Sequence, residues 1–286
     1  MSNAPDGNAP DGNAPGVARG ERVCYRHPDR HAPLSCTRCG RPICLDDAID
    51  APVGFLCPED AETPKRQQQA ARSMARLERP PTTYGVVGLI IAIYVGQRIG
   101  LVSVRDFALF GPAVAAGEWW RVLTSGFLHA NLLHIGFNGY LAFQLGRMLE
   151  APMGSSRLLA VYLAGLFGGS AGALLLSYNA LTIGASGAVF GLMGAAMLGL
   201  HRSGVNPWTS QIGSLVILNL VFTFVIPNVS VGGHIGGLAA GAAAGWVVFR
   251  VPRGHPSANL VWIVTGIVGV LSIAVGVIGW NLGLGF

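Results

Sequence analysis

Charge is scarce in this chain of 286 residues, and the scarcity is confined to one part of it. Asp, Glu, Lys and Arg make up 12% of the residues, against about 25% in an ordinary soluble domain. Residues 1–83 contain 22 of the 33 charged side chains (19 Lys and Arg, 14 Asp and Glu), whereas residues 84–286 contain only 11. With a mean hydropathy of +0.49, this distribution excludes a soluble fold for residues 84–286 and predicts an all-α polytopic membrane protein.

Acidic residues in the C-terminal half and a cluster of positive charge are also absent, and each absence excludes a class of function. Acidic residues end at Glu150, so residues 151–286 cannot supply the carboxylate of a Ser-His-Asp triad. Asp106 and Glu118 lie in a predicted loop, and no pattern places them beside a histidine. The net charge of +5 is not gathered into a phosphate-binding face, which argues against nucleic acid as a partner.

Residues 1–20 lack the apolar run of a signal peptide. They contain the tandem repeat NAPDGNAPDGNAPG at residues 3–16, whose Pro, Gly, Asn and Asp cannot bury a core. We therefore predict a disordered leader that stays in the cytoplasm.

All five cysteines fall within residues 21–62, which we interpret as a zinc-binding module. Ligand-type side chains occur there in pairs with two residues between their members, a spacing that lets a tight turn direct both at one tetrahedral ion. The pairs are Cys24 with His27, Cys36 with Cys39, Cys44 with Asp47, and Cys57 with Asp60. The ligand-bearing part, residues 24–60, has 37 residues, and so short a module needs metal ions as cross-links to fold. Disulfides or free thiols are the alternatives, but an odd number of cysteines in a reducing compartment disfavours disulfides.

This arrangement resembles a small B-box or RING-like module in which alternate pairs share an ion. The resemblance implies one site of Cys24, His27, Cys44 and Asp47 and a second of Cys36, Cys39, Cys57 and Asp60. Because Asp stands at both sites where Cys or His is commoner, we expect one or two zinc ions, with His31 as a spare ligand. The module shows no catalytic arrangement, so we expect it to bind a protein partner or to regulate.

Residues 63–83 are predicted to form a basic juxtamembrane linker, either a helix on an anionic membrane surface or a solvated segment. Seven apolar stretches follow, and the segments between them contain Pro, Gly, Asn or charged residues. They are residues 84–104, 130–150, 157–178, 185–200, 211–228, 233–250 and 259–282. We expect the first six to form a core at 84–250 and the last to be an additional transmembrane helix within 251–286.

The arginines predict how these segments are oriented. With the N-terminus inside, the inner segments carry the basic residues of the linker and Arg147, Arg157, Arg202, Arg250 and Arg253. The outer segments carry only Arg98, Arg105 and Arg121. This is the positive-inside pattern, which predicts a multi-pass cell-membrane protein with a cytoplasmic N-terminus and an outside C-terminus.

Polar residues within membrane segments are functional candidates by default. His134 and Asn138 share one face near the start of the second segment. Ser186 begins the fourth segment and His234 the sixth. Because these three segments all run from outside to inside, we expect the four residues at one depth, near the outer face.

Small residues at four-residue spacing let helix backbones approach closely in lipid. They are Gly187, Gly191, Ala195 and Gly199 in the fourth segment and Gly233, Gly237 and Gly241 in the sixth. Such closeness allows a hydrogen bond between Ser186 and His234, so we predict a catalytic dyad with His234 as the base. His134 and Asn138 are predicted to stabilise an oxyanion, and Phe190, one turn after Ser186, to pack on the His234 ring.

The motifs WWR (119–121), HIGFN (134–138), GASG (184–187) and GGHIGG (232–237), in this order, resemble the rhomboid intramembrane serine proteases. The resemblance covers about residues 84–250 and implies a six-helix core with Ser186 and His234 as the catalytic pair. It places His134 and Asn138 on the oxyanion side and an aromatic, Phe190, on the histidine. Structural positions are Trp120, Arg121, Glu150, Gly184, Gly187, Gly237 and Gly241.

The implied reaction cleaves a transmembrane segment of another protein near the outer face of the lipid bilayer, through an acyl-enzyme and without a catalytic cofactor. The seventh helix and the zinc module are additions to the family pattern. An inactive rhomboid-like protein that binds membrane clients is the alternative, although such relatives usually lack the Ser or the His. A transporter is disfavoured because segments three to six carry no internal charge and show no inverted repeat.

Overall fold

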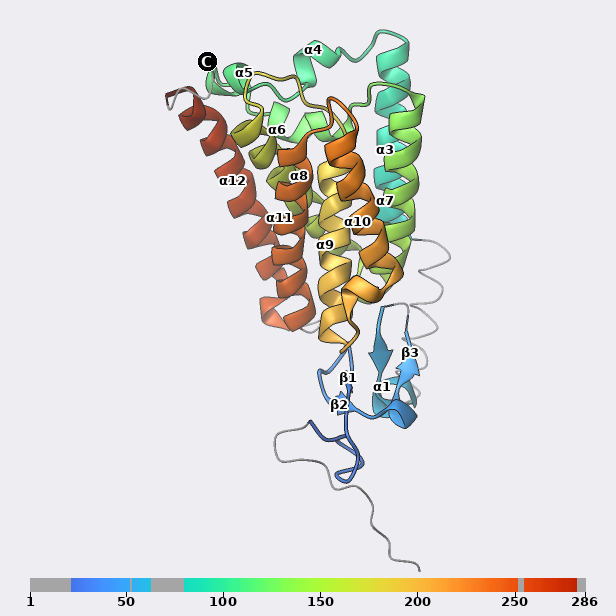
Figure 1. The fold of residues 1–286 in the computed structure, drawn as a ribbon. Coiled ribbons are helices and arrows are strands. Elements are labelled where there is room, and N and C mark those ends of the chain that lie inside the picture. Colours follow the sequence, from blue (N-terminus) through green and yellow to red (C-terminus); the bar gives the residue numbers. More distant parts are fainter. Residues whose placement is uncertain (1–21, 52, 63–79, 252–254, 282–286) are drawn as a thin grey trace, which may run out of the picture.

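The computed structural model describes residues 22–51, 53–62, 80–251 and 255–281. The predicted leader at 1–20 and most of the predicted linker at 63–83 lie outside the described residues. Figure 1 shows a bundle of helices with a small module below one end of it.

Among the described residues, seven long helices occur where the apolar stretches predict them. They are α3 (Pro81–Arg98), α7 (Leu132–Met153), α8 (Ser155–Leu176), α9 (Ser186–Arg202), α10 (Gln211–Val225), α11 (Val231–Arg250) and α12 (Leu260–Asn281). The first ends six residues earlier than its apolar stretch, because the chain turns at Gly100, whose φ is +80°. The second continues past the break expected at Pro152.

Three of these helices are long and apolar enough to cross a membrane by length and composition alone. They are α8, α11 and residues Leu260–Gly279 of α12. The helices α9 and α10 have only 17 and 15 residues, and the 22 residues of α7 include polar ones such as His134, Asn138 and Glu150. In the most apolar 18-residue stretch of α8, 67% is buried inside the structure, whereas the corresponding share in α12 is 28%. Helix α8 is therefore at the centre of the bundle and α12 at its edge.

The segment between α3 and α7, which the rhomboid resemblance implies is an outer loop at 105–129 lying partly in the membrane, contains short helices. They are α4 (Val104–Phe107), α5 (Gly111–Ala115), α6 (Arg121–Thr124) and the 3-10 helix η2 (Ser125–Phe127). Arg121 holds this segment together, because its guanidinium donates to the carbonyl oxygens of Arg105 and Ala108 at 2.7 and 2.8 Å and pairs with Glu118. Runs of four or five residues are too short to show a helical period, so the sequence did not reveal them.

The seventh long helix, α12, is attached to α8 by buried hydroxyl groups. Thr265 and Ser272 donate to the carbonyl oxygens of Ala160 and Phe167 at 2.9 and 2.6 Å. In the other direction, Tyr178 donates to the carbonyl oxygen of Gly276 at 2.5 Å. These bonds give a helix that is otherwise apolar a fixed register on the bundle.

The N-terminal module has two small antiparallel hairpins, β1 (Leu34–Ser35) with β2 (Pro42–Ile43), and β3 (Ile49–Asp50) with β4 (Phe55–Leu56). The 3-10 helix η1 (Leu45–Asp47) and the short helix α1 (Pro58–Glu62) complete it. The module rests on the end of α9: the Ser35 amide donates to the Ser203 carbonyl oxygen at 3.2 Å. Val53 is buried in the main apolar cluster of the bundle. The module is thus packed at the end of α9 opposite to Ser186 (Figure 1).

Candidate active site and metal sites

Ser186 is the first residue of α9, at the end of a sharp turn. Gly184 has a φ of +127°, a conformation that side-chain-bearing residues rarely adopt, and its amide donates to the Ser125 carbonyl oxygen at 3.0 Å. The amide groups in the first turn of a helix have no partner within that helix. Ser186 therefore lies at the positive end of the helix dipole, in a turn whose amide groups lack partners within α9.

His134 and Asn138, on α7, lie against this turn. A Cβ atom added to Gly184 would lie 2.8 Å from Nε2 of His134 and 3.8 Å from Nδ2 of Asn138. Asn131 caps α7 by accepting the His134 amide at 2.9 Å. The structure thus brings both predicted oxyanion residues beside Gly184, two positions before Ser186, and a side chain at Gly184 would displace His134.

His129 and Gln97 support this side of the site, and no role was predicted for them. The His129 ring is fully buried, with its edge against the His134 ring at a centroid distance of 5.0 Å. The Gln97 amide accepts the His129 N–H at 3.0 Å and donates to the His129 carbonyl oxygen at 3.1 Å. The only sequence signal for Gln97 was its polar side chain within the apolar stretch 84–104.

His234 comes from α11, which begins three residues earlier with Ser230 as its cap. Its imidazole is 8% exposed and stacks on the Phe190 ring, with a centroid distance of 4.2 Å and an interplanar angle of 18°. Phe190 lies one helical turn after Ser186 on α9. The stacking therefore places the His234 ring beside the first turn of the helix that begins at Ser186.

Glycines let α9 and α11 approach at this point. A Cβ atom on Gly237 would lie 2.2 Å from the Gly187 carbonyl oxygen, and one on Gly241 would lie 2.2 Å from the Gly191 Cα. A Cβ atom on Gly187 would lie 3.4 Å from the carbonyl oxygen of Gly233. The residues adjoining Ser186 and His234 are therefore in contact across the two helices.

One neighbour of His234 was missed entirely. The hydroxyl oxygen of Thr223, on α10, lies 2.5 Å from Nδ1 of His234, and both residues are buried. The sequence signal was only a hydroxyl residue in an otherwise apolar stretch, which usually bonds to its own helix.

The other residues of the family pattern shape the surrounding fold. Trp120 is half-exposed and its indole donates to the Asp106 carbonyl oxygen at 3.4 Å. Glu150 is completely buried and accepts the amides of Thr82 and Thr83, both at 2.9 Å, in the first turn of α3. It also accepts the hydroxyl of Ser155 at 2.7 Å. Glu150 is thus the anionic cap of a helix 67 residues earlier in the chain.

Comparison with known proteins identifies the family of this chain. A family model described as Rhomboid domain matches residues 116–251. Rhomboid protease GluP of Bacillus subtilis is 33% identical over 187 residues, covering 62% of this chain and 36% of that protein. Putative rhomboid protease YdcA of the same organism is 33% identical over 136 residues, covering 46% of this chain and 68% of the relative. The chain belongs to the rhomboid family.

A plant rhomboid extends the comparison. RHOMBOID-like protein 6, mitochondrial, of Arabidopsis thaliana is 31% identical over 198 residues, covering 61% of this chain and 62% of that protein. The chain thus spans little more than a third of GluP and less than two thirds of this second relative. Family membership and the helical bundle together confirm the prediction of an all-α polytopic membrane protein with a rhomboid domain.

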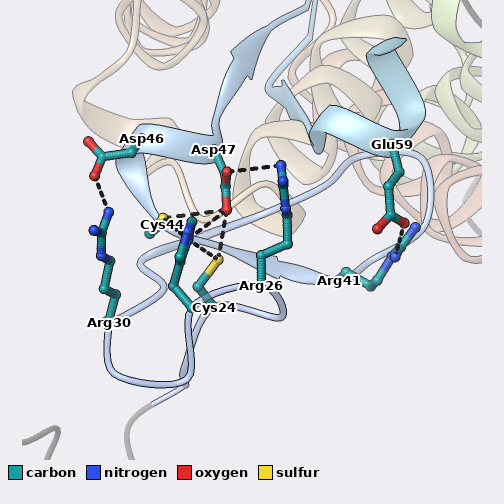
Figure 2. Close-up of polar contacts among 9 residues, drawn as sticks. Cys24, Arg26, Arg30, Arg41, Cys44, Asp46, Asp47 and Glu59 are labelled. Carbon is teal, nitrogen blue, oxygen red and sulfur yellow. Dashed lines mark hydrogen bonds and ion pairs between the residues drawn. The ribbon is translucent and has the colours of Figure 1, made fainter. Parts of the chain in front are cut away.

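Outside the rhomboid domain, the N-terminal module brings the predicted metal ligands together in two groups. In the first, the ligand atoms of Cys24, His27, Cys44 and Asp47 all lie within 4.8 Å of one another. Oδ2 of Asp47 is central: it is 3.0 Å from Nδ1 of His27 and 3.2 and 3.7 Å from the two sulfurs (Figure 2). A tetrahedral zinc ion separates such atoms by about 3.3 to 3.8 Å, so the group fits this ion.

The second group contains Cys36, Cys39, Cys57 and Asp60, again within 4.8 Å of one another. The sulfurs of Cys39 and Cys57 are 3.8 Å apart, and Oδ2 of Asp60 is 3.2 Å from the sulfurs of Cys36 and Cys57. These separations also match a tetrahedral site, with three sulfurs and one oxygen.

Charge around both groups suits a bound cation with anionic ligands. Burial raises the pKa of the Cys44 and Cys36 thiols, so a cation is needed to hold them as thiolates. Burial also opposes the charged form of Asp47, but the Cys24 hydrogen bond and the neighbouring His27 and Arg26 outweigh it and lower the pKa of Asp47. Arginines balance the excess negative charge, because Arg26 pairs with Asp47 at 3.5 Å.

Beside the second group, Arg41 has the same role. Its Nε donates to the Cys39 sulfur at 3.3 Å, and its guanidinium pairs with Glu59 (Figure 2). Contacts from such neighbouring residues orient the metal-ligating side chains and compensate their charge. The donor set, rich in thiolate, favours zinc over the hard cations Mg²⁺ and Ca²⁺.

Proposed function

We propose that this rhomboid-family chain is an intramembrane serine endopeptidase in which Ser186 is the nucleophile and His234 the general base. The stacking of His234 on Phe190 supports this proposal most directly, because it sets the imidazole beside the first turn of α9. No carboxylate is required to orient a ring that is held by an aromatic face on one side and by neighbouring helices on the others.

In the proposed reaction, His234 takes the proton of the Ser186 hydroxyl as Oγ bonds to the carbonyl carbon of the substrate. The resulting oxyanion accepts hydrogen bonds from the Ser186 amide and from the side chains of His134 and Asn138. His234 then gives the proton to the leaving amine, and the C–N bond breaks to leave an acyl-enzyme. A water molecule, deprotonated by His234, releases the acyl group and restores Ser186.

The proposed substrate is a transmembrane segment of another protein, cleaved within the bilayer near the outer face. The positive-inside distribution of arginines supports a cytoplasmic N-terminus and an outside C-terminus. The N-terminal module packs against the inner end of α9, and Ser186 lies at the opposite end of the same helix. The dyad would therefore act on the outer half of its substrate.

Cleavage of a model transmembrane substrate by the purified full chain in detergent tests this function. We expect cleavage by the wild type and by Ser214→Ala, a control serine on α10 that bonds only to its own helix in the described structure. We expect none by Ser186→Ala or His234→Ala. Cleavage that survives Ser186→Ala would overturn the proposal, and a folded wild type without activity would favour the client-binding alternative.

For the module we propose structural zinc, one ion in each ligand group, in a region that binds a protein partner or regulates the protease. Elemental analysis of the full chain is expected to give two zinc ions, and one ion after either Cys44→Ser or Cys57→Ser. A single ion in the wild type would restrict the metal to one group. No zinc, or an unchanged content in both variants, would refute the proposal.

A further inference from the structure

We infer that Thr223 is a positioning residue that fixes which nitrogen of His234 carries its proton. This inference rests on the proposed function, because it concerns the base of the dyad. It starts from the short contact between the Thr223 hydroxyl oxygen and Nδ1 of His234, at 2.5 Å. Both groups are buried, with exposures of 2% for Thr223 and 8% for His234, so water does not compete for the bond.

We assign the hydrogen atoms of this contact from the second partner of the hydroxyl. The Thr223 hydroxyl also lies 2.7 Å from the carbonyl oxygen of Asn219, one turn earlier on α10. A carbonyl oxygen only accepts, so a hydroxyl that donates to Asn219 has only its oxygen lone pairs left to offer the imidazole. The contact of 2.5 Å with the imidazole then needs a hydrogen of its own, and only an Nδ1–H of His234 supplies it.

The assignment leaves Nε2 of His234 with its lone pair. A neutral imidazole has one donor and one acceptor nitrogen, and only the acceptor can take the proton of a serine hydroxyl. With Nδ1–H directed at Thr223, the ring is held in the one tautomer that can act as a base through Nε2. In a Ser-His-Asp triad an aspartate has this role, and residues 151–286 contain no acid to do so.

The contribution of Thr223 is expected to grow as the reaction proceeds. When His234 becomes an imidazolium, its bond to Thr223 becomes charge-assisted and therefore stronger. A bond that strengthens in the transition state raises kcat rather than substrate affinity. Loss of a hydrogen bond to a charged group typically corresponds to a fall of about 10- to 100-fold in rate.

Three variants separate this role from a structural one. Thr223→Val keeps the shape and removes the hydroxyl, Thr223→Ser keeps the hydroxyl, and Thr265→Val is the matched control. Thr265 is buried like Thr223, and its hydroxyl oxygen lies 2.9 Å from each of the carbonyl oxygens of Val261 and Ala160. It belongs to α12, on the opposite side of the bundle from α10 (Figure 1).

We expect Thr223→Val to lower kcat about 10- to 100-fold at unchanged KM and to slow fluorophosphonate labelling of Ser186 by a similar factor. Thr223→Ser and Thr265→Val should stay within about twofold of wild type. If Thr223→Val folds and has the same kcat and labelling rate as the wild type, the inference is overturned, while the proposed dyad stands. If the wild type itself neither cleaves nor is labelled, the dyad fails first.

A measurement on the unmodified chain keeps the inference testable if Thr223→Val does not fold. Nitrogen chemical shifts of ¹⁵N-histidine distinguish protonated from bare ring nitrogens, and the His234 signals are assigned by their loss in His234→Asn. We expect a proton on Nδ1 and none on Nε2 at neutral pH. A proton on Nε2 alone would overturn the inference.

Discussion

The approach of α9 and α11 at Gly237 offers the sharpest quantitative prediction. A Cβ atom at this position would lie 2.2 Å from the Gly187 carbonyl oxygen and 2.9 Å from the Gly187 Cα. Real Cβ atoms essentially never come within 3.0 Å of a nonbonded heavy atom, so Gly237→Ala must push the backbones apart by about 0.8 Å. Gly187 adjoins Ser186, and Gly237 lies one turn from His234, so this shift separates the proposed dyad.

A misplacement of 1 Å costs about 100-fold in rate, so the shift of 0.8 Å predicts a fall of roughly 40-fold in kcat/KM for Gly237→Ala. Gly266→Ala is the matched control, because a Cβ atom there, on α12, has nothing within 4 Å. Both variants would be compared with wild type in the cleavage assay, with thermal unfolding as a check on folding. Wild-type kcat/KM in Gly237→Ala would show that the distance between these helices does not set the dyad.

Three other perturbations have defined outcomes. Glu150→Gln leaves the first turn of α3 without its anion and should destabilise the protein by about 2 kcal/mol, seen as a lower Tm with little change in kcat; an unchanged Tm would contradict the capping role. Phe190→Ala removes the ring stacked on His234 and should lower kcat about 5-fold, as expected for an aromatic contact of about 1 kcal/mol; full activity would show that the stacking is incidental. Chelation of the full chain should release zinc and lower the Tm of the module while the helical circular dichroism of the bundle persists; a Tm that is indifferent to chelator would contradict a structural metal.

The helices could be predicted from the sequence because the lipid bilayer surrounds them. Lipid offers no partner for backbone amides, so an apolar stretch of about 20 residues has to be helical, and all seven predicted stretches contain a helix. The ends were less accurate: Gly100 stops α3 early, whereas Pro152 does not stop α7. Helix ends depend on single turns and caps, which a hydropathy pattern does not record.

Most of the candidate site could be predicted because polar side chains are rare in apolar segments. Ser186, His234, His134 and Asn138 are conspicuous for this reason, and the structure brings them around the first turn of α9. The metal ligands were detectable from pairs with two-residue spacing, and the structure groups the pairs alternately.

What the sequence did not indicate are contacts between distant residues. Thr223 resembles an ordinary helix threonine until α10 is packed beside α11. Glu150 looks like a charge at the end of a helix until α3 is placed with its first turn against it. Arg121 holds two carbonyl oxygens that lie 13 and 16 residues earlier. In each case the partner is set by tertiary packing, which no local pattern encodes.

The central claim is that His234 makes Ser186 nucleophilic, and one measurement tests it directly. The purified full chain is treated with a fluorophosphonate, digested, and analysed by mass spectrometry for the modified residue. We expect one phosphonylated residue, Ser186, in the wild type and no adduct in His234→Ala. An adduct at another residue, or undiminished labelling of Ser186 in His234→Ala, would contradict it.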